Sequence, residues 1–175
     1  MNLYFVRHGS AGEPNPQEDA ARGLDPQGRQ QCELIGKFLK AHGVRFDDVV
    51  SSPLRRASEA AAIVAKRTRY KGEIALAPAL RPDGTYERFL ELLDEIGSVD
   101  SVLLVGHNSK LAECIGRLLT GNGKRADIHL KQGAVAKIVM KHKVATLKWC
   151  LTPRLLRACL GNGAGRNGRA RDGRR

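Results

Sequence analysis

The sequence predicts a single α/β domain, a three-layer sandwich in which helices cover both faces of a mostly parallel central sheet. Short apolar runs typical of strands alternate along the chain with longer stretches whose apolar residues recur at helical spacing. In the strand expected at residues 101–105, every residue after Ser101 is apolar, as expected for a strand buried on both faces of a parallel sheet. The chain has 175 residues, of which 42% are hydrophobic, and this is enough for one domain with a sizeable core.

The first strand and the first helix are predicted near the N-terminus. Residues 2–6 form a short run that is apolar after Asn2, and the glycines, prolines and asparagine that follow it predict a loop. Asp25 followed by Pro26 is typical of a helix start, because aspartate caps free N–H groups and proline fits the first helical turn. Apolar residues then recur at helical spacing as far as Gly43, which predicts an amphipathic helix.

A second strand and a second helix follow. Residues 46–50 have the composition of a short strand and lead into Ser52 and Pro53. Serine can cap a helix and proline can occupy its first position, so a helix is expected from here to about Arg67. Residues 74–77 are expected to form a third short strand.

The remaining elements follow from turn residues and apolar spacing. The Pro-Asp-Gly sequence at residues 82–84 predicts a turn. The other expected elements are a helix that includes residues 89–96, the strand at 101–105, a helix that includes residues 111–119, and two adjacent strands at 134–140 and 145–151.

Half of the formal net charge of +12 lies at the end of the chain, since residues 154–175 contain seven arginines and one acid. Residues 161–175 are rich in glycine and contain no large apolar residue, which predicts a disordered basic Gly/Arg tail after a folded domain of residues 1–160. Such a tail can make weak, salt-sensitive contacts with RNA or another polyanion. A solvated tail without a specific partner is the favoured interpretation.

Several classes of protein are excluded by patterns that the sequence lacks. No apolar run approaches the ~18 residues of a membrane span, and the first residues do not follow a secretory signal pattern, so a cytoplasmic protein with no membrane partner is expected. No metal-ligand spacing and no glycine-rich nucleotide motif occurs, so neither a metal nor another cofactor is expected. The cysteines are expected to be reduced core residues: Cys32, Cys114, Cys150 and Cys159.

Three predicted strands end at residues that can bind an anion. Ligands of open α/β sheets bind at the carboxyl ends of the strands, where the sequence places Arg7 and His8, then Arg55, then His107 and Asn108. Taken singly, each arginine or histidine is more often structural, but their convergence favours a site. Two arginines, two histidines and a helix start include no carboxylate, so a phosphoryl group is the expected ligand.

The sequence resembles the histidine phosphatase superfamily, the phosphoglycerate-mutase-like group, and within it the small SixA-type phosphohistidine phosphatases. The resemblance covers about residues 1 to 157 and rests on these motifs: Val6-Arg7-His8-Gly9, Arg22 before Leu24, Ser52-Pro53-Leu54-Arg55-Arg56-Ala57, Leu80-Arg81-Pro82, Val105-Gly106-His107-Asn108, and the segment from Trp149 to Pro153. It implies the following roles: His8 as nucleophile, Arg7, Arg55 and His107 as phosphoryl ligands, and Arg22, Gly9 and Asn108 as further substrate-binding residues.

The chain also departs from the family pattern. Ser109 and Lys110 stand where the family often has Pro-Gly, which alters the pocket rim. Larger relatives place a proton-donating carboxylate after the third strand, and the nearest candidates in this chain are Asp83 and Glu87. Asp83 also fits the predicted turn, and the turn is the favoured interpretation. A missing acid suits phosphohistidine, whose leaving nitrogen can be protonated before it departs, better than a sugar phosphate.

Three functions remain open at this point. The favoured one is a metal-independent phosphatase that removes phosphoryl groups from phosphohistidine in proteins, through a phosphohistidine intermediate on His8. The second is a small-molecule phosphomonoesterase with the same site. The third is a non-catalytic module that binds a phosphorylated ligand, or binds RNA through the basic tail. The expected partner is a phosphorylated protein or a small phosphorylated substrate, and the sequence predicts no oligomeric state.

Overall fold

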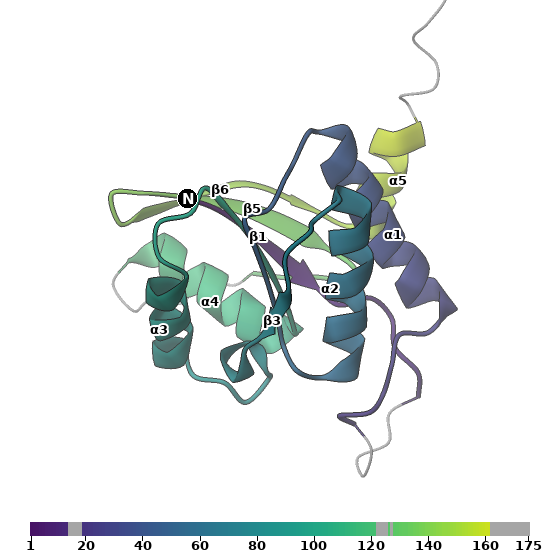
Figure 1. Cartoon of the computed structure of the whole chain (residues 1–175), viewed down its shortest axis with the longest axis horizontal. Coiled ribbons are helices and arrows are strands. Elements are labelled where there is room, and N and C mark those ends of the chain that lie inside the picture. Colours follow the sequence, from purple (N-terminus) through teal and green to yellow (C-terminus); the bar gives the residue numbers. More distant parts are fainter. Residues whose placement is uncertain (14–18, 122–125, 127, 162–175) are drawn as a thin grey trace, which may run out of the picture.

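The computed structural model describes residues 1–13, 19–121, 126 and 128–161. Strands and helices alternate along most of this part of the chain (Figure 1). In chain order the elements are β1 (Asn2–Arg7), α1 (Pro26–Ala41), β2 (Asp48–Ser51), α2 (Arg55–Thr68), β3 (Ile74–Leu76), the short 3₁₀ helix η1 (Pro78–Leu80), α3 (Tyr86–Ile96), β4 (Ser101–Gly106), α4 (Asn108–Thr120), β5 (Val135–Lys141), β6 (Val144–Leu151) and α5 (Pro153–Gly161).

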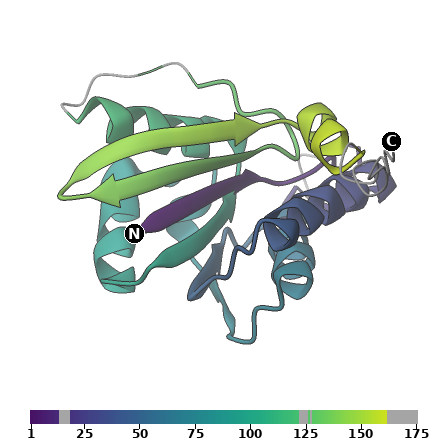
Figure 2. The ribbon, with the colours of Figure 1, turned by 90° about the horizontal axis from the view of Figure 1, so that it is seen from above.

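The described strands form one mixed sheet in the order β3-β2-β4-β1-β5-β6. The pairs β3·β2, β2·β4 and β4·β1 are parallel, whereas β1·β5 and β5·β6 are antiparallel. The expectation of a mostly parallel sheet therefore holds for the part formed by β3, β2, β4 and β1, and not for β5 and β6. The connection from Lys141 to Val144 is too short for a parallel crossover, so β5 and β6 form a hairpin beside β1 (Figure 2).

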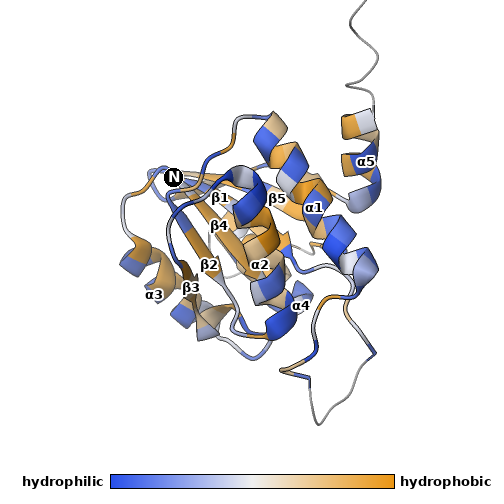
Figure 3. Ribbon diagram, turned by 45° about the vertical axis from the view of Figure 1, so that its right-hand side comes forward, coloured by the Kyte–Doolittle hydropathy of each residue, from blue (hydrophilic) through white to orange (hydrophobic). Residues whose placement is uncertain are grey.

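Helices lie on both faces of the sheet, and β1 shows why each face is buried. Its side chains alternate, so that Tyr4 and Val6 join one core cluster with residues of α1, α2 and α5. Leu3 and Phe5 join the other cluster, with residues of α3 and α4. Figure 3 shows hydrophobic residues concentrated on the strands and on the helix faces turned toward them. Burial on both sides confirms the interpretation of the apolar run in β4.

The end of the described chain differs from the sequence-based expectation. Residues Pro153–Gly161 form α5, a helix that the sequence pattern does not predict, and Leu156 anchors it in the core next to α1. Cys159 on α5 is exposed, so the expectation of a buried core cysteine is wrong for this residue. The expected disordered tail, apart from Gly161, lies outside the described residues. Among the helices described, none is both long and apolar enough to cross a bilayer.

Candidate active site

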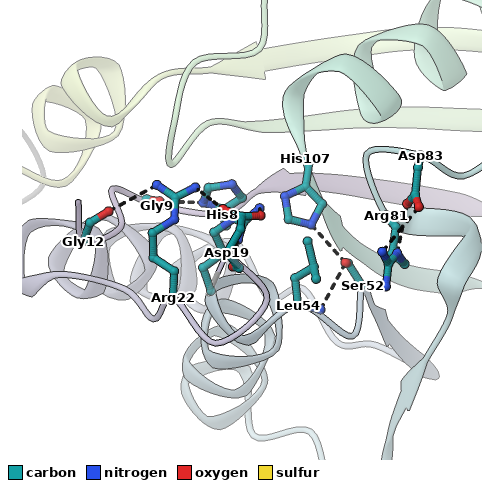
Figure 4. A network of polar contacts seen from close by, with 11 residues as sticks. His8, Gly9, Gly12, Asp19, Arg22, Ser52, Leu54, Arg81, Asp83 and His107 are labelled. Carbon is teal, nitrogen blue, oxygen red and sulfur yellow. Dashed lines mark hydrogen bonds and ion pairs between the residues drawn. The ribbon is translucent and has the colours of Figure 1, made fainter. Parts of the chain in front are cut away.

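The carboxyl ends of β1, β2 and β4 bring two histidines together at one edge of the sheet. His8 follows β1 and is 7% exposed, while His107 follows β4 and is 4% exposed. Their ring centroids are 5.0 Å apart. Figure 4 shows His107 between His8 on one side and Ser52, which follows β2, on the other. The structure therefore places the two sequence-predicted histidines in one site.

A close approach of the chain to α1 holds His8 in position. A Cβ atom on Gly9 would lie 2.4 Å from the carbonyl oxygen of Gly28, so only glycine fits between the strand end and the first turn of α1. The carbonyl oxygen of Gly9 lies 2.7 Å from Nδ1 of His8. Because a carbonyl only accepts, the neutral ring carries its proton on Nδ1, and the lone pair of Nε2 is left free.

Three arginines lie close enough to His8 for their charges to lower its pKa: Arg56, Arg7 and Arg22. Arg7 donates to the carbonyl oxygen of Leu130 over 2.8 Å. Arg22 donates to the carbonyl oxygen of Gly12 over 3.1 Å. Within the described residues the Nε atom of each of the three arginines is buried without a hydrogen-bond partner. Buried donors of this kind suit a ligand with several acceptor oxygens.

Asp19 also lies in the site, although the sequence predicts no carboxylate there. Its two oxygens accept from Arg22 over 2.9 Å and from Arg56 over 3.0 Å. Its backbone carbonyl accepts from Arg56 over 2.7 Å. Partial burial opposes ionisation, but the hydrogen bonds and charges of Arg56 and Arg22 outweigh it and hold the pKa of Asp19 below its usual range. The carboxylate thus aligns two of the three arginines. Figure 4 shows one of them, Arg22, beside Asp19.

The structure does not bring Arg55 to the site, which corrects the sequence-based assignment. Its side chain is 61% exposed and pairs with Glu59 one helical turn further on, over 2.8 Å. Arg56 takes the expected place, since it is 4% exposed and its charge reaches both histidines. Successive residues of a helix point about 100° apart, so two neighbouring arginines cannot share one environment.

His107 is oriented by Ser52 and lies at the start of α4. A hydrogen bond of 2.9 Å joins Nε2 of His107 and Oγ of Ser52. The Ser52 hydroxyl oxygen also accepts from the backbone N–H of Leu54 over 3.3 Å, so Ser52 links the histidine to the start of α2. His107 caps α4 without a side-chain bond to its N–H groups, and Oδ1 of Asn108 is buried with no partner in the described structure. The first turn of α4 therefore faces the site with free polar groups.

Asp83, the candidate proton donor, lies at the rim of the site. Gly84 donates its N–H to the carbonyl oxygen of Arg81 over 3.1 Å, which confirms the predicted turn. The Asp83 side chain is 69% exposed and pairs with Nε of Arg81 over 2.9 Å. The hydrogen bond from Arg81 lowers the pKa of Asp83. Glu87, the other candidate, pairs with Arg117 on α4 over 3.4 Å.

Both histidines are held neutral by their surroundings. Burial lowers the pKa of His8 to about 4, and the charges of Arg56, Arg7 and Arg22 add to this effect, while the hydrogen bond to Gly9 opposes it. Burial also lowers the pKa of His107 to about 3, with contributions from His8 and Arg56. At neutral pH both rings are therefore uncharged, and the free Nε2 of His8 carries no proton.

These low pKa values predict that acid destabilises the fold. Between pH 6.5 and about 4 the unfolded chain binds protons at His8 and His107 that the folded chain does not bind. The free energy of unfolding should therefore fall as the pH is lowered, by roughly 1.4 kcal/mol per pH unit for each histidine kept neutral. Urea unfolding at pH 7, 6 and 5 measures this slope.

The variant His107→Gln should show a shallower slope, whereas His142→Gln, at an exposed position, should keep the wild-type slope. Equal slopes for wild type and His107→Gln would contradict the lowered pKa of His107.

In the part of the chain that the structure describes, no cluster of three or more His, Cys, Asp or Glu side chains is placed to hold a metal ion.

Comparison with known sequences relates part of the chain, including His8 and Arg56, to one protein family. Residues 3–82 match the model of the histidine phosphatase superfamily, branch 1. The chain is 33% identical over 120 residues to an uncharacterized protein of Picosynechococcus sp., in an alignment that covers 65% of this chain and 70% of that protein. It is 29% identical over 98 residues to a broad-specificity phosphatase of Saccharomyces cerevisiae, covering 54% of this chain and 40% of the yeast protein.

Solved structures share the fold along most of the chain. The protein histidine phosphatase SixA, solved in complex with tungstate, superposes with a TM-score of 0.77 at 24% identity, covering 88% of this chain and 98% of that one. A putative alpha-ribazole-5'-P phosphatase from Escherichia coli superposes with a TM-score of 0.70 at 21% identity, covering 89% and 98% of the two chains. At these identities the likeness establishes the fold.

Proposed function

The chain belongs to the histidine phosphatase superfamily, and from this premise we propose that it removes phosphoryl groups through a covalent phosphohistidine on His8. The observation that carries the proposal is the buried His8, which is neutral, has a free Nε2 and is surrounded by the guanidinium groups of Arg7, Arg22 and Arg56. A neutral imidazole is a nucleophile, and guanidinium groups attract and stabilise a phosphoryl group.

The reaction takes place in two steps. In the first, Nε2 of His8 forms a bond to phosphorus while the bond from phosphorus to the leaving group breaks, and the leaving group takes that electron pair. In the second, water attacks phosphorus, the Nε2–P bond breaks, its electron pair returns to the ring, and inorganic phosphate leaves. The covalent intermediate divides one difficult displacement into two easier ones.

The surrounding groups stabilise charge on the three equatorial phosphoryl oxygens. Arg7, Arg22 and Arg56 bind them through N–H donors, and preorganised donors of this kind supply most of the catalysis in phosphoryl transfer. His107 and Asn108 contact the phosphoryl group from the start of α4. Gly9 fixes the tautomer of His8 and allows α1 to approach.

Phosphohistidine in proteins is the substrate class that suits this site. Asp83 and Asp19 both have lowered pKa values and are ionised at neutral pH, so neither has a proton to give to an alkoxide leaving group. The leaving nitrogen of phosphohistidine can take its proton before it departs. The shared fold with a protein histidine phosphatase supports the same class.

The substrate proposal is tested by comparing kcat/KM for a phosphohistidine peptide with kcat/KM for a phosphoserine peptide, sugar phosphates and nucleotides. The phosphohistidine peptide should give the highest value. Asp83→Asn should change every value by less than about threefold, because an exposed ion pair contributes little. Asp94→Asn, at an exposed position on α3, is the matched control.

The competing candidate is a small-molecule phosphomonoesterase, which the similarity to a broad-specificity phosphatase favours. It predicts that a sugar phosphate or nucleotide is the best substrate. It also predicts that Asp83→Asn lowers ester hydrolysis on the order of 10²-fold, the contribution of a general acid. That result would replace phosphohistidine as the proposed substrate.

A further inference from the structure

A second cationic hollow adjoins the candidate active site. Its volume is about 420 Å³, and it lies between the loop that precedes β5 and the start of α5. Arg7 lines this hollow as well as acting on His8, so the two sites share one side chain. Lys131, Arg154 and Arg157 supply the other permanent charges of the lining, which includes no carboxylate among the described residues.

These three cations are available to a ligand. Lys131, Arg154 and Arg157 are exposed, and the described part of the chain offers none of them an ion pair. Some other arginines with largely exposed side chains do have partners, as Arg55 has Glu59 and Arg81 has Asp83. A group of unpaired positive charges around a hollow attracts anions and focuses the field there.

The hollow is held in a fixed position relative to His8. The loop that carries Lys131 is tied to the end of β1, because Arg7 donates to the carbonyl oxygen of Leu130 over 2.8 Å. The N–H of Gly133 also donates to the carbonyl oxygen of His8 over 3.1 Å. On the other side, Pro153 and Leu156 are buried and fix α5, so that Arg154 and Arg157 project from one face of a packed helix.

We infer that this hollow binds acidic side chains that flank the phosphorylated residue of a polypeptide substrate. This inference rests on the proposed function and adds a sequence preference to it. Exposed ion pairs are weak one at a time, so cations spread over a hollow suit a chain with several carboxylates better than a single small anion. No aromatic side chain lines the hollow among the described residues, apart from the His129 imidazole, so it offers little surface on which a nucleic acid base could stack.

The test measures binding of two fluorescent peptides to the full chain by anisotropy, a signal that does not depend on turnover. Both peptides carry a phosphonate analogue of phosphoserine, in which carbon replaces the ester oxygen and prevents hydrolysis. One has glutamate residues on both sides and the other has glutamine at the same positions. The wild-type protein should bind the glutamate peptide about tenfold more tightly at low salt, and the difference should shrink as salt is raised.

The double variant Arg154→Ala/Arg157→Ala should reduce this preference to about twofold. Its hydrolysis of p-nitrophenyl phosphate should equal that of the wild type, which shows that the fold and the catalytic centre are intact. Arg45→Ala/Lys71→Ala removes the same charge from exposed positions that line a different hollow, and it should keep the full preference.

Equal binding of the two peptides by the wild type would overturn the inference, as would a preference that survives in Arg154→Ala/Arg157→Ala. A single-stranded RNA that displaces the glutamate peptide and loses its affinity in the same variant would assign the hollow to RNA instead. The proposed function is tested separately. If the protein prefers the glutamate peptide but does not hydrolyse a phosphohistidine peptide, the inference about the hollow is supported and the proposed substrate class is contradicted.

Discussion

Replacement of His8 by alanine is expected to lower phosphatase turnover by on the order of 10⁴-fold or more, because the covalent step has no other nucleophile in the described site. His107 is 5.0 Å away between ring centroids, but its Nε2 is engaged with Ser52. Its Nε2 is therefore not free to take over the role of His8. Steady-state kcat on p-nitrophenyl phosphate measures the loss.

The control for this variant is His142→Ala, which changes an exposed histidine in the β5–β6 hairpin and should keep wild-type kcat. His8→Ala should also gain stability in acid relative to the wild type, since it no longer buries an imidazole that must stay neutral. Residual activity of His8→Ala within tenfold of the wild type would show that another group attacks phosphorus.

Replacement of two adjacent arginines on α2 should change the activity by very different amounts. Arg56→Ala is expected to lower kcat/KM by about 10³-fold, since its guanidinium is buried beside both histidines and stabilises charge on the phosphoryl oxygens. Arg55→Ala should stay within about threefold of the wild type, because it loses only an exposed ion pair with Glu59. Measurement of kcat and KM on the same substrate compares the two.

Thermal unfolding checks that Arg56→Ala is folded. A second variant, Arg56→Lys, keeps the positive charge but loses the planar guanidinium. Arg56→Lys should recover only part of the activity, because lysine cannot bind two oxygens side by side. Equal losses in Arg55→Ala and Arg56→Ala would mean that α2 does not turn Arg56 inward and Arg55 outward.

The choice between the two arginines shows how much of the site could have been predicted. Ala60 and Val64 follow Arg56 at intervals of four and are both fully buried, so helical periodicity places Arg56 on the inner face of α2. Glu59 follows Arg55 at the same interval and forms an exposed ion pair with it. The signal was present in the sequence, but the motif alone did not reveal which arginine points inward.

Other parts of the site depend on contacts that a local pattern does not encode. The carboxyl-end rule for strands correctly brings His8 and His107 together, because it follows from the order of strands and helices. Asp19 lies in a loop, and its place between Arg22 and Arg56 depends on how that loop packs against α2. The bond between Ser52 and His107 joins residues 55 positions apart in the chain.

The strand β4 and the helix α5 differ in the same way. The apolar run of β4 predicts a strand buried on both sides, because every residue of it must be covered. The helix α5 is short and arginine-rich, and it is stabilised by the burial of Pro153 and Leu156 and by the packing of the partly buried Leu160 against the core. Stabilisation of that kind comes from tertiary packing, which the local sequence does not show.

The central claim is that His8 carries the phosphoryl group during turnover, and trapping that intermediate tests it most directly. The protein is mixed with a labelled phosphodonor, denatured in alkali within the first turnover, digested, and mapped by mass spectrometry. We expect label on Nε2 of His8 that is stable in alkali, lost in acid, and absent in His8→Ala. Label that survives acid, or label on any other residue, would contradict the claim.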